Sequence, residues 1–184
     1  MSGIRLNRIS PEVAIAADRV VRVQREDVEL LKQFAAGSNI GRSRICAHKD
    51  SGDQLHEMLI ALGKQTYIRP HKHFNKSESF HIVEGEVDIV IFHETGAVSD
   101  VIQLGDFPSG RAFFYRLADP WFHTLLIRSE VVVFHETTNG PFKKEETVFA
   151  PWSPEEKDAA SVRTFMEALS QTVANLALKP AAGC

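Results

Sequence analysis

Between residues 55 and 137, short apolar runs alternate with clusters of Gly, Asp, Asn, Ser or Pro. Such runs, closely spaced and bounded by turn residues, predict β-strands. We expect strands at residues 55–62, 66–73, 79–83, 87–93, 98–104, 112–117, 123–127 and 130–137. About eight short strands in succession predict a mostly β fold of the jelly-roll or small-barrel kind.

The segments before and after this region have apolar residues at the spacing of a helix. Val28, Leu31 and Phe34 predict a helix at about residues 27–36, and Gly37 can end it. Before it, residues 20–23 read as a short strand, and residues 39–52 read as turns. At the other end, Ser153–Glu156 has a capping box with proline at the first helical position, which predicts a helix over 153–178.

This second helix has one apolar stripe, made of Val162, Phe165, Met166, Leu169, Val173 and Leu176. The stripe suits docking on the barrel or a contact within a dimer. We favour docking, because the single apolar face of a surface helix needs only one partner layer. The chain then forms one domain, with residues 1–54 as an N-terminal extension, 55–150 as the barrel core and 153–178 as the C-terminal helix.

The composition narrows the classes of function. The 184 residues are 43% hydrophobic and 24% charged, with a formal net charge of -3. The absence of a Lys/Arg-rich run argues against a nucleic-acid partner and against a polybasic membrane patch. Two cysteines, Cys46 and Cys184, are too few for a disulfide framework. With no secretory pattern near the start and no long apolar segment, we expect a cytoplasmic protein.

The candidate chemistry lies in the histidines, of which the chain has eight. His71 and His73 are two apart, so on a strand their imidazoles share one face. Glu78 follows a short turn, and an antiparallel return brings its carboxylate back toward them. Two neutral nitrogens and one anionic oxygen suit a divalent transition metal.

The pattern His-x-His, four residues, Glu, six residues, Gly, found at His71, His73, Glu78 and Gly85, resembles the first motif of the cupins. The resemblance implies a double-stranded β-helix barrel that holds a metal on three histidines and a glutamate. It also implies that the third histidine comes from a second motif, which His123 matches best. Cupins often pair through edge strands, so the resemblance implies a homodimer.

A narrower resemblance runs from about Arg42 to Glu155. Its motifs are the segments 42–48, 67–78, 134–142 and 149–155, in that order. Together they resemble the WbuC-type cupin metalloproteins, which are often encoded among bacterial O-antigen and surface-polysaccharide genes. The resemblance implies one divalent transition metal, Fe, Zn, Ni or Mn, and a small polar ligand such as a sugar derivative. It implies no particular reaction.

Strand parity suggests further site residues around His71. Tyr67 and Arg69 share its face if residues 66–73 form a regular strand. Tyr67 would then be a catalytic residue that moves a proton. Arg69 would bind a carboxylate or phosphate at the mouth of the barrel, or pair with an acid on its rim. Glu136 shares the parity of Phe134 and is expected inside as a catalytic acid or base.

Three more residues are candidates for ligand binding. Arg111 and Tyr115 precede His123 and can form a basic, aromatic lip for an anionic sugar. Trp121 shares the parity of His123 and either walls the pocket or packs in the core. His81 falls on the opposite face from Glu78 and is not expected to bind metal.

Two classes of function follow. The first is a metal-dependent enzyme, an isomerase or epimerase of a small polar metabolite, or an Fe(II)-dependent dioxygenase. The second is a non-catalytic module that binds or senses a ligand through its metal. The sequence has no Ser-His-Asp order, phosphate-binding glycine loop or His-Glu-x-x-His helix, so hydrolase, kinase and zincin activities have no support.

Overall fold

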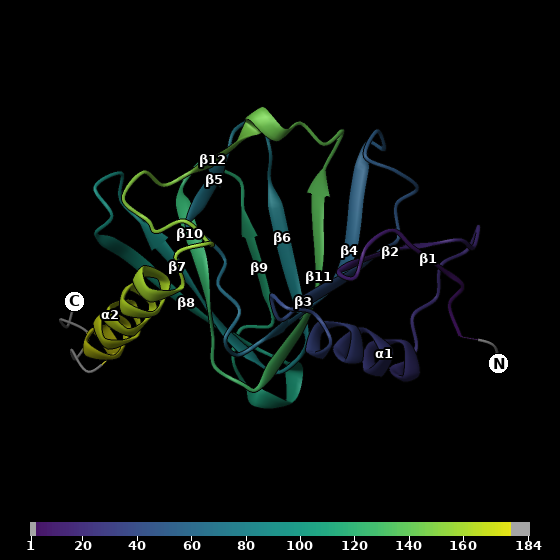
Figure 1. Cartoon of the computed structure of the whole chain (residues 1–184), viewed down its shortest axis with the longest axis horizontal. Coiled ribbons are helices and arrows are strands. Elements are labelled where there is room, and N and C mark those ends of the chain that lie inside the picture. The colour runs from purple at the N-terminus through teal and green to yellow at the C-terminus, as the bar shows by residue number, and fades with distance from the viewer. Residues whose placement is uncertain (1–2, 178–184) are drawn as a thin grey trace.

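The structure is a computed structural model and describes residues 3–177. In that part of the chain, twelve strands and two α-helices follow one another (Figure 1): β1 (Leu6–Arg8), β2 (Val13–Ala16), α1 (Arg25–Ala36), β3 (Arg42–Cys46), β4 (Leu55–Gly63), β5 (His71–His73), β6 (Glu78–Glu84), β7 (Glu86–Phe92), β8 (Val98–Gly105), β9 (Phe114–Leu117), β10 (Phe122–Ile127), β11 (Val131–Asn139), β12 (Thr147–Phe149) and α2 (Ala159–Ala177).

The strands form two sheets. The larger sheet has seven strands in the order β1-β2-β3-β4-β11-β6-β9, and the smaller has five in the order β12-β5-β10-β7-β8. All neighbouring pairs are antiparallel except β2 and β3. One apolar cluster joins the inner faces of both sheets, with Leu62, Phe80 and Phe134 from the larger and Ile89 and Leu125 from the smaller. The predicted mostly β jelly roll is confirmed.

Each sheet also has an apolar outer face, and one helix covers each (Figure 1). Helix α1 packs Val28, Leu31 and Ala35 against residues of the larger sheet, including Ile45. Helix α2 packs Leu169 and Val173 against the smaller sheet, on Val90, Phe92, Phe122 and Leu126. Burial of a Leu or Val side chain contributes roughly 1.5–3 kcal/mol, so both helices are held mainly by these faces. Docking of α2 on the barrel is confirmed.

The start of α2 differs from the prediction, because the helix begins at Ala159. The Oγ of Ser153 donates to the carbonyl oxygen of Ala150 at 2.8 Å and so closes a turn. The cap is provided by Asp158, whose carboxylate accepts from the backbone N–H of Ser161 at 3.1 Å and from its hydroxyl at 2.6 Å. The predicted last residue, 178, lies outside the described residues.

Helix α1 begins two residues before the predicted start. The backbone N–H of Gln24 donates to the carboxylate of Asp27 at 2.8 Å, which fixes the first turn. The predicted strand at 20–23 is absent. Strands β1 and β2 were not predicted, and the segment 39–52 contains β3 rather than turns alone. Neither helix of residues 3–177 is long and apolar enough to cross a membrane.

The predicted strand 66–73 is regular only in its last three residues. Pro70 has no N–H for a strand ladder. The carbonyl oxygen of Ile68 accepts a hydrogen bond from the hydroxyl of Thr124 instead of a neighbouring backbone N–H. Residues 66–70 therefore do not alternate as a strand does, and parity arguments do not apply to them.

Candidate metal centre

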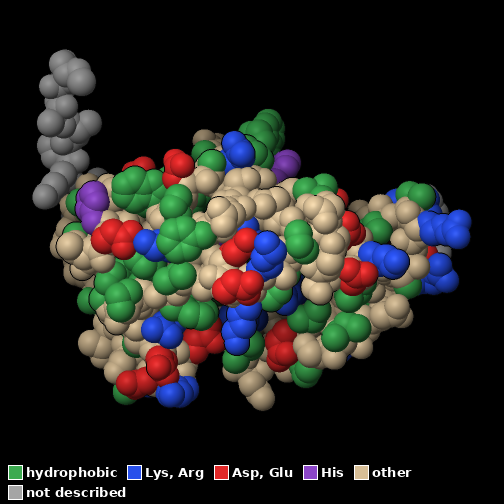
Figure 2. Space-filling model, turned by 90° about the horizontal axis from the view of Figure 1, so that it is seen from above, with side chains coloured by type: hydrophobic (Ala, Val, Ile, Leu, Met, Phe, Trp, Pro, Cys, Tyr) green, Lys and Arg blue, Asp and Glu red, His purple; other side chains and the backbone are tan. Residues whose placement is uncertain are grey.

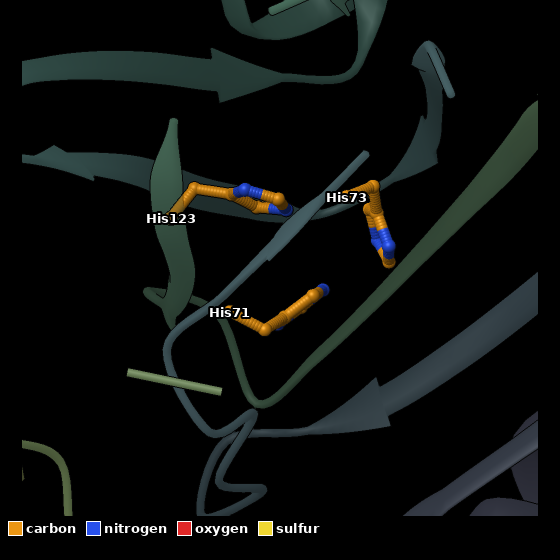
Figure 3. Close-up of side chains that lie close together, drawn as sticks. All are labelled: His71, His73 and His123. Atoms are coloured by element: carbon orange, nitrogen blue, oxygen red, sulfur yellow. The ribbon is translucent and has the colours of Figure 1, made fainter. Parts of the chain in front are cut away.

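Three imidazoles meet inside the barrel, at one end of the smaller sheet (Figure 3). His71 and His73 lie on β5, and His123 lies directly opposite His71 on β10. One ring nitrogen from each of the three lies within 4.8 Å of the others. Residues 71–73 are a regular strand, so His71 and His73 share one face, as the sequence spacing predicted. The pairing of β5 with β10 brings His123 beside them.

The other ring nitrogen of each histidine is held by the surrounding chain. The Nδ1 of His71 lies 2.8 Å from the carbonyl oxygen of Arg69, and the Nδ1 of His123 lies 3.0 Å from that of Trp121. A carbonyl oxygen only accepts hydrogen bonds, so both Nδ1 atoms carry a proton, and in the neutral imidazole the lone pair then lies on Nε2. Partners of this kind orient the histidine ligands of metal sites.

The Nδ1 of His73 lies 3.0 Å from the hydroxyl of Thr147. Strand β12 pairs with β5 so that Thr147 stands opposite His73. Sequence reasoning missed Thr147, because residues 147–149 follow a long connection and nothing in their pattern indicates which strand they join.

Glu78 reaches the imidazoles from the opposite sheet. Its Oε1 lies 3.0 Å from the Nε2 of His123, and its Oε2 lies 3.6 Å from the Nε2 of His73. The sequence predicted an antiparallel return beside the histidines, but Glu78 opens β6 of the larger sheet. Asn75, with a φ of 57°, turns the chain from one sheet to the other. Asn139 holds this turn through hydrogen bonds to Ser77 and Asn75.

The protonation states of these groups suit metal binding. Burial lowers the pKa of His71 to about 3 and also lowers that of His73, which favours neutral imidazoles. Burial acts in the opposite sense on Glu78, but the neighbouring His123 holds the pKa of this carboxyl below its ordinary value. Against the effect of burial, Glu78 raises the pKa of His123, so a bound metal would displace a proton from this imidazole. Metal ligands must be neutral imidazoles and ionised carboxylates, the form that His71, His73 and Glu78 already favour.

One further observation tests whether the residues fit a metal. The Oε1 of Glu78 is fully buried, and it has a hydrogen-bond donor among the described residues only if the Nε2 of His123, 3.0 Å away, carries a proton. Nearly all buried polar atoms in proteins have a partner, so this oxygen calls for a positive charge beside it, either a metal ion on the imidazoles or the proton of His123. Three nitrogens and one oxygen, with no thiolate, fit Fe(II), Mn(II), Ni(II) or Zn(II).

The four residues lie at one end of a cavity of about 640 Å³. Its walls are the inner face of the larger sheet, from β2 to β6, and the ends of β5, β10 and β12. Glu136 on β11 lines it, as the sequence predicted. Burial raises the pKa of Glu136 to about 8, and the nearby charge of Glu78 acts in the same direction.

Tyr67 and Arg69 do not line this cavity. The hydroxyl of Tyr67 donates to the carbonyl oxygen of Pro154 at 3.0 Å, and its ring lies 6.2 Å from that of Phe165 on α2. The Nε of Arg69 donates to the hydroxyl of Ser153 at 3.1 Å. The expectation that both share the face of His71 is wrong, because residues 66–70 are not a regular strand.

Arg111, Tyr115 and Trp121 form no lip around the centre. The guanidinium of Arg111 contacts the carboxylate of Glu86 at 3.1 Å. Glu86 begins β7, whereas Ile91, which pairs with His123, lies near the other end of that strand. The side chain of Trp121 is 45% exposed, and only its backbone carbonyl contacts His123.

Tyr115 is buried in the core, with its ring 5.5 Å from that of Phe80. Its hydroxyl is buried without a partner among the described residues. Burial and the charge of Glu78 raise the pKa of Tyr115, and the residue is only 5% exposed, so it forms no part of a mouth. His81 is exposed beside Phe113 on the outer face, as predicted for a residue that does not bind metal.

Comparison with known proteins agrees with this fold. A family model described as a domain of unknown function (DUF6016) matches residues 23–104, less than half of the chain. A search of curated proteins found no match. A crystal structure of a Shewanella oneidensis protein covers 81% of this chain and 96% of its own, at 11% identity and a TM-score of 0.54.

A second crystal structure, of a Klebsiella pneumoniae protein described as having a double-stranded β-helix domain, covers 73% of this chain and 93% of its own. Its identity is 12% and its TM-score is 0.51. The chain therefore has the cupin fold, a double-stranded β-helix, and likeness at this level of identity carries the fold alone.

Proposed function

We propose that this protein is a metal-binding cupin that holds one divalent transition metal on His71, His73, Glu78 and His123. The observation that carries the proposal is the convergence of the four donors: one ring nitrogen of each histidine lies within 4.8 Å of the others, and the buried Oε1 of Glu78 lies 3.0 Å from the Nε2 of His123. The carbonyl oxygens beside the Nδ1 atoms of His71 and His123 support it, because they leave the Nε2 atoms free to bind.

The protein acts on or binds a small polar metabolite in the cavity that leads to this centre. A bound divalent ion supplies Lewis acidity, which polarises a carbonyl or binds two oxygens of a ligand. Glu136 supplies a carboxyl whose pKa of about 8 lets it hold and release a proton near neutral pH. An isomerase or epimerase uses both features. An Fe(II)-dependent dioxygenase is the redox alternative.

The motifs between Arg42 and Glu155 support a finer proposal, a WbuC-type protein of surface-polysaccharide metabolism whose ligand is a sugar derivative. The homodimer and the cytoplasmic location stay predictions from the sequence. A non-catalytic binding module is the second candidate. It is expected to retain its ligand through purification, so that mass spectrometry of a denatured extract detects a small molecule and no product forms.

The test is the metal content of tag-free protein, measured by element-resolved mass spectrometry. We expect near one transition metal ion per chain in the wild type and a strong reduction in His123→Ala. His81→Ala is the matched control, because His81 is exposed on the outer face of the barrel, and it should keep the metal.

Absence of metal from the wild type, even after incubation with Fe(II), Mn(II), Ni(II) and Zn(II), would refute the proposed function. Metal retained in His123→Ala would show that another residue completes the donor set. The identity of the metal then separates the reactions, since iron favours oxygen-dependent chemistry and zinc, nickel or manganese favours isomerisation or binding.

A further inference from the structure

The cavity has a second polar region, on the wall made by β3. Alternate residues of this strand face opposite sides, so Arg42, Arg44 and Cys46 line the cavity while Ile45 packs under α1. Lys76 adds another cation from the turn between β5 and β6, two residues before Glu78. The cavity therefore joins the candidate metal centre to a group of basic side chains.

Two of these cations have no counter-ion. Among residues 3–177, no carboxylate lies within 4.0 Å of the Nζ of Lys76 or of the guanidinium of Arg44, whereas Arg42 pairs with Glu156 at 3.5 Å. Lys76 is only 9% exposed, and its Nζ lies 5.1 Å from the ring of Phe142. Arg44 is exposed to solvent and Lys76 is largely buried, so an anion that enters the cavity would meet two cations with no competing carboxylate beside them.

The outer surface offers a contrast. Acidic and basic side chains lie side by side over the middle of the face shown in Figure 2. Pairs such as Arg5–Asp18 and Lys64–Glu130, each at 2.7 Å, are close contacts. Arg44 and Lys76 are thus unpaired in a protein that pairs many of its exposed charges.

The carboxylates that line the cavity do not neutralise these cations. Glu78 contacts the imidazoles, and Glu12 contacts the hydroxyls of Ser10 and Ser38 at 3.1 and 3.3 Å. Asp50, which is exposed, accepts from the backbone N–H of Gly52 at 2.8 Å. Glu136 lies more than 4.0 Å from both cations. Arg44 and Lys76 therefore line one cavity without a carboxylate partner.

We propose that Arg44 and Lys76 together bind the carboxylate or phosphate group of a small polar metabolite, while hydroxyl or carbonyl oxygens of the same molecule face the metal centre. The second half of this statement rests on the proposed function. Arg44 offers a planar fork for two oxygens and Lys76 a point charge. A cavity of about 640 Å³ holds a molecule of monosaccharide size.

The test compares three probes of similar size and different charge: D-glucose, D-gluconate and D-glucose 6-phosphate. Isothermal titration calorimetry on zinc-loaded and on metal-free wild-type protein measures their affinities. We expect both anions, or one of them, to bind at least about 10-fold more tightly than glucose, because hydrogen bonds to charged groups are stronger than those between neutral groups. The tighter of the two anions distinguishes a carboxylate site from a phosphate site.

Arg44→Gln and Lys76→Met should each weaken binding of the preferred anion by about 10-fold or more while leaving the metal content unchanged. Lys64→Met is the control, because Lys64 lies outside the cavity and pairs with Glu130, and it should bind as the wild type does. Arg44→Lys keeps the charge and should recover part of the affinity. Circular dichroism checks that each variant is folded, and Arg44→Lys serves if Arg44→Gln does not fold.

Equal affinity for glucose and both anions would overturn the inference, as would unchanged anion binding in the folded variants or no anion binding at up to about 10 mM. These outcomes are separate from the metal. Wild-type protein without metal that still binds an anion through Arg44 and Lys76 would refute the proposed function and retain this inference. Protein that holds metal but shows no preference for anions would support the proposed function and refute this inference.

Discussion

Gly85 stands at the tight connection between β6 and β7, with a φ of +85°. A Cβ at this position would lie 2.4 Å from the carbonyl oxygen of Val131 and 2.5 Å from the hydroxyl of Ser129. Gly85→Ala therefore faces both backbone strain and a steric clash. We expect a loss of more than about 2 kcal/mol in the free energy of unfolding, measured by urea denaturation.

Gly110 provides a matched control for that substitution. Its φ is +73°, and a Cβ there would meet nothing within 4 Å. Gly110→Ala should therefore show the backbone strain alone, about 1–2 kcal/mol. If the two alanine variants lose equal stability, the contact with Val131 is not what requires glycine at position 85.

At the residue scale, the sequence predicted the candidate metal ligands better than the residues that surround them. His71, His73 and Glu78 could be predicted because a three-residue strand and a short turn leave little freedom. Tyr67 and Arg69 were misplaced because Pro70 ends the regular alternation. Thr147 and Arg44 belong to strands whose position depends on long-range pairing, which residue spacing does not determine. Lys76 lies in the short turn itself, but spacing does not show that its side chain lines the cavity.

At the element scale, the docking of α2 makes a sharp prediction. Leu169 is 5% exposed and packs in the cluster with Phe92 and Phe122, whereas Leu176 on the same helix is 40% exposed. Leu169→Ala should lower the free energy of unfolding by about 2–5 kcal/mol, because it removes buried contacts and leaves a cavity. Leu176→Ala should cost less than about 1 kcal/mol. Similar losses in chemical denaturation would contradict the docking seen here.

Strand β3 shows why some elements escaped prediction. Its residues Arg42, Ser43 and Arg44 lack the apolar alternation of a half-buried strand. The structure explains this, because Arg42, Ser43 and Arg44 line a polar cavity while Ile45 packs under α1. The polar residues that prevented the prediction of β3 are those that line the cavity with the proposed anion site.

The boundaries of α2 teach a related lesson. Ser153 to Glu156 has the residue types of a helix start, but the hydroxyl of Ser153 is already used in a local turn with Ala150 and in a tertiary contact with Arg69. The helix then begins at the next suitable cap, Asp158. The apolar periodicity of the helix predicted its existence and its docked face, while its first residue depended on contacts made 84 residues apart in sequence.

At the scale of the whole molecule, the candidate metal centre connects the two sheets. The three histidines lie on β5 and β10 of the smaller sheet, and Glu78 lies on β6 of the larger. An ion bound by all four residues would therefore hold the two sheets together in the folded state. Because the unfolded chain offers no such site, metal binding should raise the thermal midpoint of unfolding.

We expect zinc at about 100 times its dissociation constant to stabilise the wild type by about 2.7 kcal/mol. Glu78→Gln keeps the three imidazoles on one sheet and removes the charged donor from the other, so its gain on adding zinc should be smaller. Glu130→Gln alters an exposed carboxylate on the surface and should gain as much as the wild type. Each gain is measured against the same variant without zinc by calorimetry, so differences in the metal-free proteins cancel. An equal gain in Glu78→Gln would mean that the imidazoles alone hold the ion and that it does not join the sheets.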